Sequence, residues 1–423
     1  MRRATAGIDT VSRPGHRLPA LVIVSLCVCN GAAAQEAPTS AFSLSGFGTL
    51  GVVHSSEDRA DFGVTAFKPD GAGYTQDFSP EVDSRVGVQL TINAAADLTA
   101  TLQVIAEQRQ NGRYMPHVEW ANIKYQITPQ LSVRVGRTAL ANFLVSDFRK
   151  VGYANPWVRP PEEVYSLIPI SSGDGVDASY TLNAGAVTHT LLAGFGKSDS
   201  KSTDGEVARG RNEWTFSDTL EYGPLTLRVA YQTGKVRIAT LAALMAGFRQ
   251  FGAQGNALAD RYDPNDRKIT FLALGGTYDP GQWFVTTEWG RSNLRSAFGE
   301  RTVWYATSGY RIMSLTPYLT YATTKANSNT SDPGLTLSSL PPEQAAQAAG
   351  LNAALNSVLA SLPVQQTVSA GARWDFMANV ALKLQYDHMN MGVGSAGVLG
   401  NVQPGFQKGG TVHLFSASMD FVW

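Results

Sequence analysis

The chain has 423 residues with 34 basic and 34 acidic side chains, so its formal net charge is zero, and 43% of its residues are hydrophobic. This balance argues against nucleic acid as a partner, because binding to a phosphate backbone needs a basic surface. After the N-terminal region, no stretch approaches the roughly 18 consecutive apolar residues of a transmembrane helix, which excludes a helical membrane protein.

Residues 1–34 have the features of a secretory signal peptide. Four arginines make a basic start, Leu18 to Cys29 carry no charge, and Ala32 to Ala34 supply a small-residue cleavage site before Gln35. The apolar stretch is shorter than the ~20 residues that cross a bilayer. Cleavage would remove both cysteines, so we expect a single exported domain at 35–423 without a disulfide or a Cys-ligated metal. We also expect no other metal and no cofactor.

Apolar and polar residues alternate with a period of two through most of the exported domain. Val86, Val88 and Leu90 share one face of such a segment, whereas Arg85 and Gln89 share the other. Segments of about 9 to 13 residues with this pattern recur about sixteen times, near the length of a tilted transmembrane strand. We expect strands at 42–53, 83–95, 97–109, 116–127, 131–139, 175–183, 186–197, 212–222, 225–236, 268–278, 283–293, 301–311, 315–325, 366–376, 380–391 and 411–423.

The connections between these segments alternate between very short turns and longer polar loops. The longer loops are expected at about 54–82, 110–115, 140–174, 198–211, 237–267, 294–300, 326–365 and 392–410. Short turns on one side and loops on the other predict an all-β fold, an even-stranded antiparallel barrel with both termini on the short-turn side. A soluble β-sandwich has no reason to sort its connections in this way.

Two of the long loops have helical periodicity. Apolar residues recur at helical spacing from Leu241 to Phe248 and from Leu351 to Leu362, and Pro341 and Pro342 precede the second segment. We expect amphipathic helices that cover the rim of the barrel. Lids, or receptor sites for extracellular partners, are the alternative.

Aromatic residues mark the short-turn side of the expected barrel. The expected girdle consists of Tyr125, Tyr180, Tyr222, Tyr310, Trp374 and Phe376. Asp218 breaks the pattern, because it falls on the lipid-facing side of the segment 212–222. Either that register slips or Asp218 lies near an interface, since a charge at mid-membrane is costly.

Several short motifs resemble those of Gram-negative porins, the superfamily of general-diffusion and phosphate-selective channels. The motifs are Ser84–Gly87, Val133–Arg137, Thr316–Tyr318, Ala381–Asp387 and a last strand that ends on aromatic residues. The resemblance implies a 16-stranded barrel in the bacterial outer membrane, a homotrimer with one aqueous pore in each subunit, and a third loop, 140–174, folded into the lumen. It also implies that the barrel-assembly machinery recognises the C-terminal Phe421 and Trp423.

Charged residues with inward parity are the candidate selectivity site, because a barrel of this size leaves an aqueous channel. We expect a basic wall of Arg134, Arg228, Arg373 and Lys383, with Arg85 and Arg109 at the outer vestibule. Asp147, Glu162 and Glu163 of the third loop would oppose that wall. The alternative is that these are ordinary lumen charges, neutralised by their neighbours.

Aromatic residues of the third loop allow two interpretations. They are Phe143, Phe148, Tyr153, Trp157 and Tyr165. They could form a stacking track for sugars or aromatic acids. Packing of the loop against the barrel wall is the favoured interpretation, because a long loop inside a lumen must bury side chains to stay ordered.

The expected function is passive diffusion of small hydrophilic solutes and ions across the outer membrane. A channel specific for anionic or sugar-like solutes is the alternative, and a barrel enzyme is less favoured. The five histidines after residue 34 lie in no recognisable nucleophile or metal motif.

Overall fold

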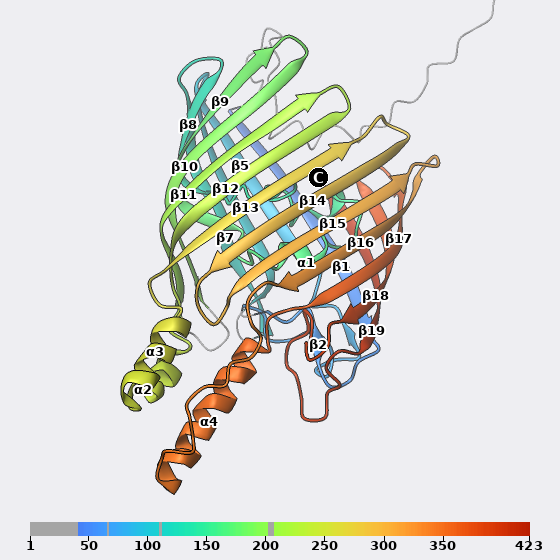
Figure 1. Cartoon of the computed structure of the whole chain (residues 1–423). Coiled ribbons are helices and arrows are strands. Elements are labelled where there is room, and N and C mark those ends of the chain that lie inside the picture. The colour runs from blue at the N-terminus through green and yellow to red at the C-terminus, as the bar shows by residue number, and fades with distance from the viewer. Residues whose placement is uncertain (1–40, 66, 110–111, 202–206) are drawn as a thin grey trace, which may run out of the picture. The chain divides into compact units, whose positions relative to one another are not determined.

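The computed structural model describes residues 41–65, 67–109, 112–201 and 207–423, and the expected signal peptide lies outside these ranges. Within them, sixteen long antiparallel strands close into one barrel (Figure 1). They are β1 (Phe42–Ser55), β5 (Arg85–Ala95), β6 (Leu98–Arg109), β7 (Arg113–Gln126), β8 (Leu131–Ala139), β9 (Ser172–Ala184), β10 (Val187–Lys201), β11 (Val207–Tyr222), β12 (Leu225–Arg237), β13 (Arg267–Tyr278), β14 (Trp283–Leu294), β15 (Glu300–Tyr310), β16 (Leu315–Ala326), β17 (Gln365–Met377), β18 (Val380–Met391) and β19 (Thr411–Val422).

All sixteen expected strands are confirmed, with small shifts at their ends. The largest shift is at the start of β11, expected at residue 212 and observed at Val207. A β-bulge between Arg211 and Trp214, with Asn212 at a φ of 50°, interrupts the alternation there. Such a bulge adds a residue to one strand, so a strict period of two ends too early.

Alternation along each strand separates a polar interior from an apolar exterior. On β14, for example, Trp283 and Val285 are exposed outward, whereas Thr286 and Glu288 are buried inward. The six aromatic residues of the expected short-turn girdle are all exposed on the outer surface. This surface suits a lipid bilayer, with amphipathic rings at the level of the headgroups.

The first and last strands close the barrel through paired backbones and aromatic packing. β1 pairs with β5 on one side and with β19 on the other, where Leu50 lies opposite Met419. The rings of Phe421 and Trp423 lie over Gly48 and Gly46, and a Cβ atom at either glycine would overlap a ring. Glycine is therefore required at both positions, because the rings occupy the space of a side chain.

Asp218 does face outward, and no register slip occurs around it. It lies opposite Leu191 on β10 and Val229 on β12. Its carboxylate is 3.0 Å from Nδ1 of His189, which also lies on the outer face. The pairing supplies a partner for a carboxylate that would otherwise be isolated among apolar side chains.

The loops on the side opposite the short turns carry the remaining elements. The first loop contains β2 (Asp61–Phe62), β3 (Ala72–Gly73) and β4 (Phe78–Ser79), and the third contains η3 (Gly152–Ala154) and α1 (Glu162–Tyr165). The two expected helices are confirmed as α2 (Ala242–Arg249) and α4 (Pro342–Leu359), and a helix that was not expected, α3 (Gly252–Tyr262), follows α2. They share one apolar cluster that includes Met245, Leu258 and Leu355. None of the helices in the described residues has the length and apolar character needed to cross a membrane.

Gly46 and Gly48 make room for the two terminal rings, and this role can be tested by substitution. The double substitution Gly46→Ala/Gly48→Ala should destabilise the barrel by about 1–3 kcal/mol, because both terminal rings must move away from β1. The folded fraction, measured by the heat-dependent shift of the band on a denaturing gel, should fall. Gly194→Ala on β10 is the control, since the nearest atom to its added Cβ lies at 3.4 Å. An unchanged folded fraction in the double variant would show that the closure between β1 and β19 does not need these glycines.

Candidate functional site

The third loop runs inside the barrel, as expected. It leaves β8 after Ala139, crosses the lumen and returns to β9 at Ser172, and α1 lies within the ring of strands (Figure 1). Its apolar residues form one cluster with inward residues of β12, β13, β15 and β16, including Phe271, Val303 and Tyr318. The lumen is therefore partly filled by the loop rather than by side chains of the wall alone.

Aromatic residues of the loop pack against the wall. Trp157 is 2% exposed and donates from Nε1 to Thr307 at 3.0 Å. The Tyr165 hydroxyl donates to Glu288 at 2.5 Å, and the Tyr305 hydroxyl donates to the same carboxylate oxygen at 2.8 Å. Phe143 stacks edge-on against Phe271. These contacts confirm the packing interpretation over a solvent-exposed stacking track.

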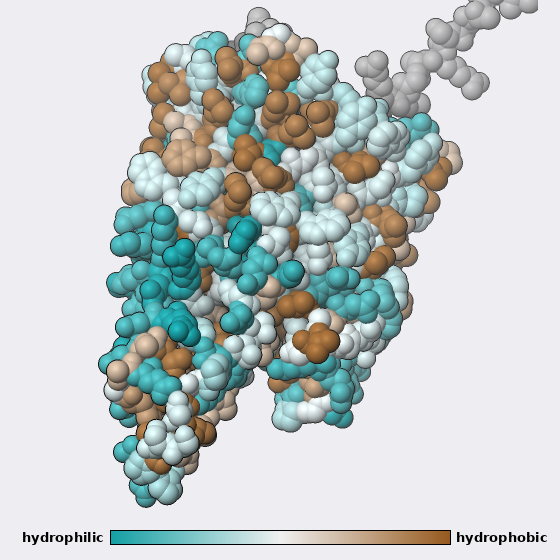
Figure 2. All heavy atoms as spheres, viewed as in Figure 1, coloured by the Kyte–Doolittle hydropathy of each residue, from teal (hydrophilic) through white to brown (hydrophobic). Residues whose placement is uncertain are grey.

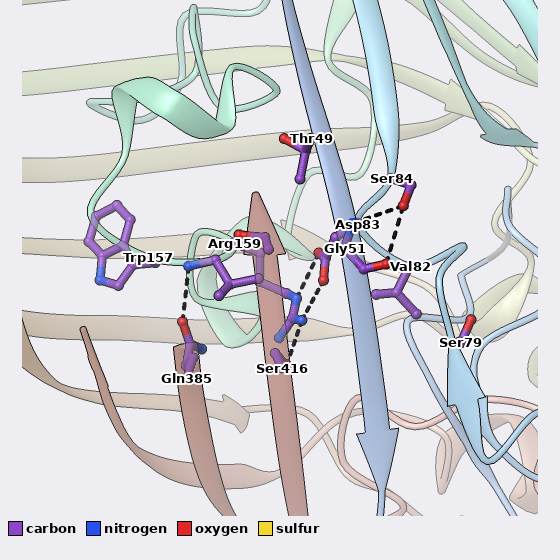
Figure 3. A network of polar contacts seen from close by, with 12 residues as sticks. Thr49, Gly51, Ser79, Val82, Asp83, Ser84, Trp157, Arg159, Gln385 and Ser416 are labelled. Atoms are coloured by element: carbon purple, nitrogen blue, oxygen red, sulfur yellow. Dashed lines mark hydrogen bonds and ion pairs between the residues drawn. The ribbon is translucent and has the colours of Figure 1, made fainter. Parts of the chain in front are cut away.

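Arg159 is the central polar contact of the loop (Figure 3). Its guanidinium donates to both carboxylate oxygens of Asp83, at 2.9 and 2.6 Å, and to the Ser416 hydroxyl at 2.8 Å. Asp387 lies 3.6 Å away on β18. The side chains of Arg159 and Asp83 are 6% and 2% exposed. A buried bidentate pair of this kind joins the third loop, the first loop and the last two strands.

Burial and charge act in opposite directions on this pair. Burial by itself lowers the pKa of Arg159, but the carboxylates of Asp83 and Asp387 raise it by more than burial lowers it. The net pKa is therefore above its usual value. Burial by itself raises the pKa of Asp83, but Arg159 lowers it more, so the net pKa is below its usual value. Both groups are therefore charged across the physiological pH range.

Lys383 faces inward but lies under the loop. Its side chain is 0% exposed, and Nζ donates to the carbonyl oxygens of Gly152 and Trp157, both at 2.7 Å, and to Asp420 at 2.8 Å. The burial corrects the expectation that Lys383 faces the pore water. Its charge is compensated by Asp420, so it holds η3 in place instead.

Arg373 also contacts the backbone of the loop. Its Nη1 donates to the carbonyl oxygens of Tyr153 and Asn155, at 2.5 and 3.1 Å, and its guanidinium stacks over the Tyr153 ring at 4.6 Å. Asp375 on the same strand is 2.7 Å away. Like Lys383, this arginine supports the loop.

Arg134 lies on the part of the wall that the loop leaves open, and Arg228 lies at the edge of that part. Arg134 on β8 is 31% exposed and donates to Asp177 on β9 at 2.9 Å. Arg228 on β12 is partly exposed and donates to the carbonyl of Ala141 at 3.0 Å. These two remain candidates for a basic wall in contact with water.

The two vestibule arginines differ from each other. Arg85 is 17% exposed, donates to the carbonyl of Asp83 at 3.1 Å and lies 4.0 Å from Glu107. Arg109, at the end of β6, is partly exposed. Arg85 therefore belongs to the polar network behind the loop.

The three loop acids do not form one face. Glu163 is 4% exposed and accepts hydrogen bonds from Gln365, at 2.5 Å, and from Thr367, so it is not a water-facing charge. Glu162 is partly exposed beside a small cavity that it shares with Trp157 and Asp387. Asp147 is partly exposed on the opposite side of the loop, near Gln103 of β6 and Glu119 of β7. Burial raises the pKa of both Glu162 and Glu163.

A lysine that the sequence reasoning did not single out attaches the loop to β6 and β7. Nζ of Lys150 lies 2.7 Å from Glu107 and 2.9 Å from Glu119. His117 contacts the same Glu119 at 3.2 Å. The sequence signal for this contact is that Glu107 and Glu119 both face inward on neighbouring strands. Two carboxylates side by side in a barrel wall need a cation, and a lysine of the third loop supplies it.

The loop leaves the wall from β8 to β11 largely uncovered, and β12 lies at its edge. Inward residues of β14 to β19 are buried, for example Thr307, Thr320 and Ser369. Most inward residues of β9 to β11 stay partly exposed, for example Thr190 and Thr219. The aqueous part of the lumen therefore runs along β8 to β11. It is lined by hydroxyl groups and by Arg134, and Arg228 lies at its edge on β12. In the described part of the chain, no cluster of three or more His, Cys, Asp or Glu residues is arranged to hold a metal ion.

Comparisons with known proteins agree with this architecture. The family model for the Gram-negative porin matches residues 20–330. Similar solved structures include an anion-selective porin from Comamonas acidovorans, with 11% identity, a TM-score of 0.54 and coverage of 90% of this chain and 99% of that chain. OmpF of Salmonella typhi, in complex with daunomycin, has 12% identity, a TM-score of 0.55 and coverage of 90% and 97%. The outer membrane channel DcaP of Acinetobacter baumannii has 13% identity, a TM-score of 0.50 and the same coverage. No curated protein sequence matches the chain.

The anchoring role of Arg159 can be tested directly. Arg159→Leu leaves Asp83 and Asp387 buried without their cation, which should cost about 3–5 kcal/mol and loosen the loop. Single-channel recordings in planar bilayers should then show a larger and noisier conductance. Asp147→Asn, a change in the same loop at a residue outside this network, should leave the noise as in the parent protein. A steady, unchanged conductance in Arg159→Leu would contradict the anchoring role.

Proposed function

The chain belongs to the Gram-negative porin family and forms a diffusion channel of the bacterial outer membrane, and we propose that small hydrophilic solutes and ions pass through it passively. Their path follows the wall from β8 to β11, without enzymatic turnover. The single observation that supports this path is the partial exposure of most inward residues on β9 to β11, in contrast to the mostly buried inward residues of β14 to β19. A hydrated path lined by hydroxyl groups suits polar solutes, because such groups exchange hydrogen bonds with water at little cost.

The charges beside this path support a weak selectivity. Arg134 and Arg228 place guanidinium groups on β8 and β12, at its two edges, and Asp177 is the partner of Arg134. Asp147 and Glu162 are the partly exposed acids of the loop. We propose that these four charges, and not Arg373, Lys383 or Glu163, produce the transverse field across the lumen. Walls of low dielectric strengthen such a field.

The proposal includes assembly as a homotrimer, which the family resemblance implies. Apolar side chains exposed on β1, β5 and β6, including Leu44, Val88 and Leu102, offer a surface that a neighbouring subunit could cover. Lipid would cover the same surface in a monomer. The mass of the purified protein in detergent, measured by light scattering, distinguishes the two assemblies.

The selectivity part of the proposal predicts the direction of a change in reversal potential. Neutralising the wall with Arg134→Gln/Arg228→Gln should shift the reversal potential toward cations, and Asp147→Asn/Glu162→Gln should shift it toward anions. Both shifts should be larger at low salt, because the Debye length falls from about 10 Å at 0.1 M to about 3 Å at 1 M. The measurement is the zero-current potential across a planar bilayer under a salt gradient.

A matched control removes charges that lie outside the lumen. Lys325→Gln/Lys408→Gln changes two exposed lysines, one at the end of β16 and one in the loop before β19, and should leave the reversal potential unchanged. Shifts of equal size in the control and in the wall variant would show that overall charge sets the selectivity. Conductance that saturates at millimolar solute would favour a specific channel over passive diffusion.

A further inference from the structure

Two histidines lie opposite each other on the outer face of the last two strands. His388 on β18 is the register partner of His413 on β19, and both are partly exposed. Leu384 and Phe415, which have the same parity on the two strands, are exposed outward, so the imidazoles also point outward. Residues directly opposite each other on antiparallel strands have Cβ atoms about 4.5–5.5 Å apart. The backbone register therefore holds the two rings side by side.

The histidine pair lies where the outer surface changes from apolar to polar. Toward the short turns, the next outward residues are Tyr386 and Phe415, and toward the loops they are Asn390 and Thr411. The face of the barrel in Figure 2 changes in the same direction, with hydrophobic residues spread near the short turns and hydrophilic residues gathered near the loop ends at the lower left. The pair therefore lies at the loop-side edge of the apolar band, where water and ions reach it.

The ring nitrogens of the pair are spaced like two ligands of one tetrahedral metal ion. Nδ1 of His388 lies 3.4 Å from Nδ1 of His413, which is long for a protein hydrogen bond. Zinc–imidazole bonds are about 2.0–2.1 Å long, so two nitrogens at a tetrahedral angle of about 109° are about 3.3–3.4 Å apart. A neutral imidazole can carry its hydrogen on Nε2, which leaves the lone pair of Nδ1 for a metal ion.

A third donor atom lies beside the pair. The hydroxyl oxygen of Tyr386 is 2.7 Å from Nδ1 of His413. The Tyr386 ring is nearly parallel to the His413 ring, with an interplanar angle of 11°, and it packs against Phe415 with a centroid distance of 5.0 Å. These ring contacts fix the phenolic oxygen next to the two nitrogens. Two nitrogens and one oxygen thus converge on the same point of the outer surface.

We propose that His388 and His413 bind a divalent transition-metal ion such as Zn²⁺ through their Nδ1 atoms, with the Tyr386 oxygen and water in the remaining positions. Imidazole nitrogen suits Zn²⁺ and Cu²⁺, whereas Mg²⁺ and Ca²⁺ prefer oxygen ligands. The site uses only two histidines, so it differs from clusters of three or more His, Cys, Asp or Glu residues, of which the described ranges contain none. It lies outside the lumen, so it is independent of the proposed diffusion path.

Titration of the purified, untagged protein with Zn²⁺ in detergent, followed by isothermal titration calorimetry, tests the site. The parent protein should bind one ion per chain at saturation, and His388→Ala and His413→Ala should each weaken binding by at least about tenfold. Loss of even an outer partner of a metal ligand costs about 10–100-fold in affinity, so loss of a ligand should cost no less. Tyr386→Phe should weaken binding by a smaller factor, since water can take the place of the phenolic oxygen.

His54→Ala is the matched control, because His54 lies on the same outer face of β1 but has other partners. Its Nδ1 is 2.8 Å from the carbonyl oxygen of Asp77, and its ring stacks on Phe78 at 4.6 Å. This variant should bind Zn²⁺ as the parent protein does, and Mg²⁺ should bind to neither. Absence of saturable Zn²⁺ binding in the parent, an equal loss in His54→Ala, or equal binding of Mg²⁺ would overturn the proposal.

Thermal unfolding gives a second measurement of the same site. A ligand that binds only the folded barrel raises its unfolding temperature, and here the ion would also join β18 to β19. Zn²⁺ should therefore raise the unfolding temperature of the parent protein and leave that of His388→Ala/His413→Ala unchanged. An equal rise in both proteins would contradict the proposal, because it would place the ion elsewhere. The heat-dependent shift of the gel band, at parent level without Zn²⁺, confirms that each variant is folded.

Discussion

The buried ion pair between Arg159 and Asp83 is the contact on which the arrangement of the lumen depends. A loop inside a barrel must give its polar groups partners and its charges counter-charges, because uncompensated burial is costly. Arg159 meets this requirement at the point where the first loop, the third loop and β19 converge. Lys383, which is paired with Asp420, holds the loop backbone at Gly152, and Lys150 of the loop pairs with Glu107, so the loop is held at three places.

The strands could be predicted from the sequence because each of them separates a lipid-facing side from a polar interior. That difference is visible as alternation along the sequence, for example of Val86 and Val88 with Arg85 and Gly87. The start of β11 was missed because the bulge at Asn212 breaks the period without changing the pairing further along the strand. The helices α2 and α4 were predictable for a related reason, since their apolar residues recur at helical spacing and meet in one cluster.

The water-facing charges could not be separated from the buried ones by parity alone. Lys383 and Arg134 have the same inward parity, yet one is 0% and the other 31% exposed. The difference depends on the path of the third loop, which is set by contacts between residues more than 200 positions apart, such as Lys383 with Gly152. Alternation describes a single strand, and it carries no information on which wall a loop covers.

Accessibility of the two walls to a water-soluble reagent tests the central claim that the loop covers β14 to β19 and leaves β8 to β11 open. The described residues contain no cysteine, so single cysteines can be introduced at Thr219 on the open wall and at Thr320 under Trp157. A charged methanethiosulfonate reagent should reduce the conductance of Thr219→Cys within minutes and leave that of Thr320→Cys unchanged. Equal reaction rates at the two positions would contradict the account, because they would mean that the loop does not shield the wall it packs against.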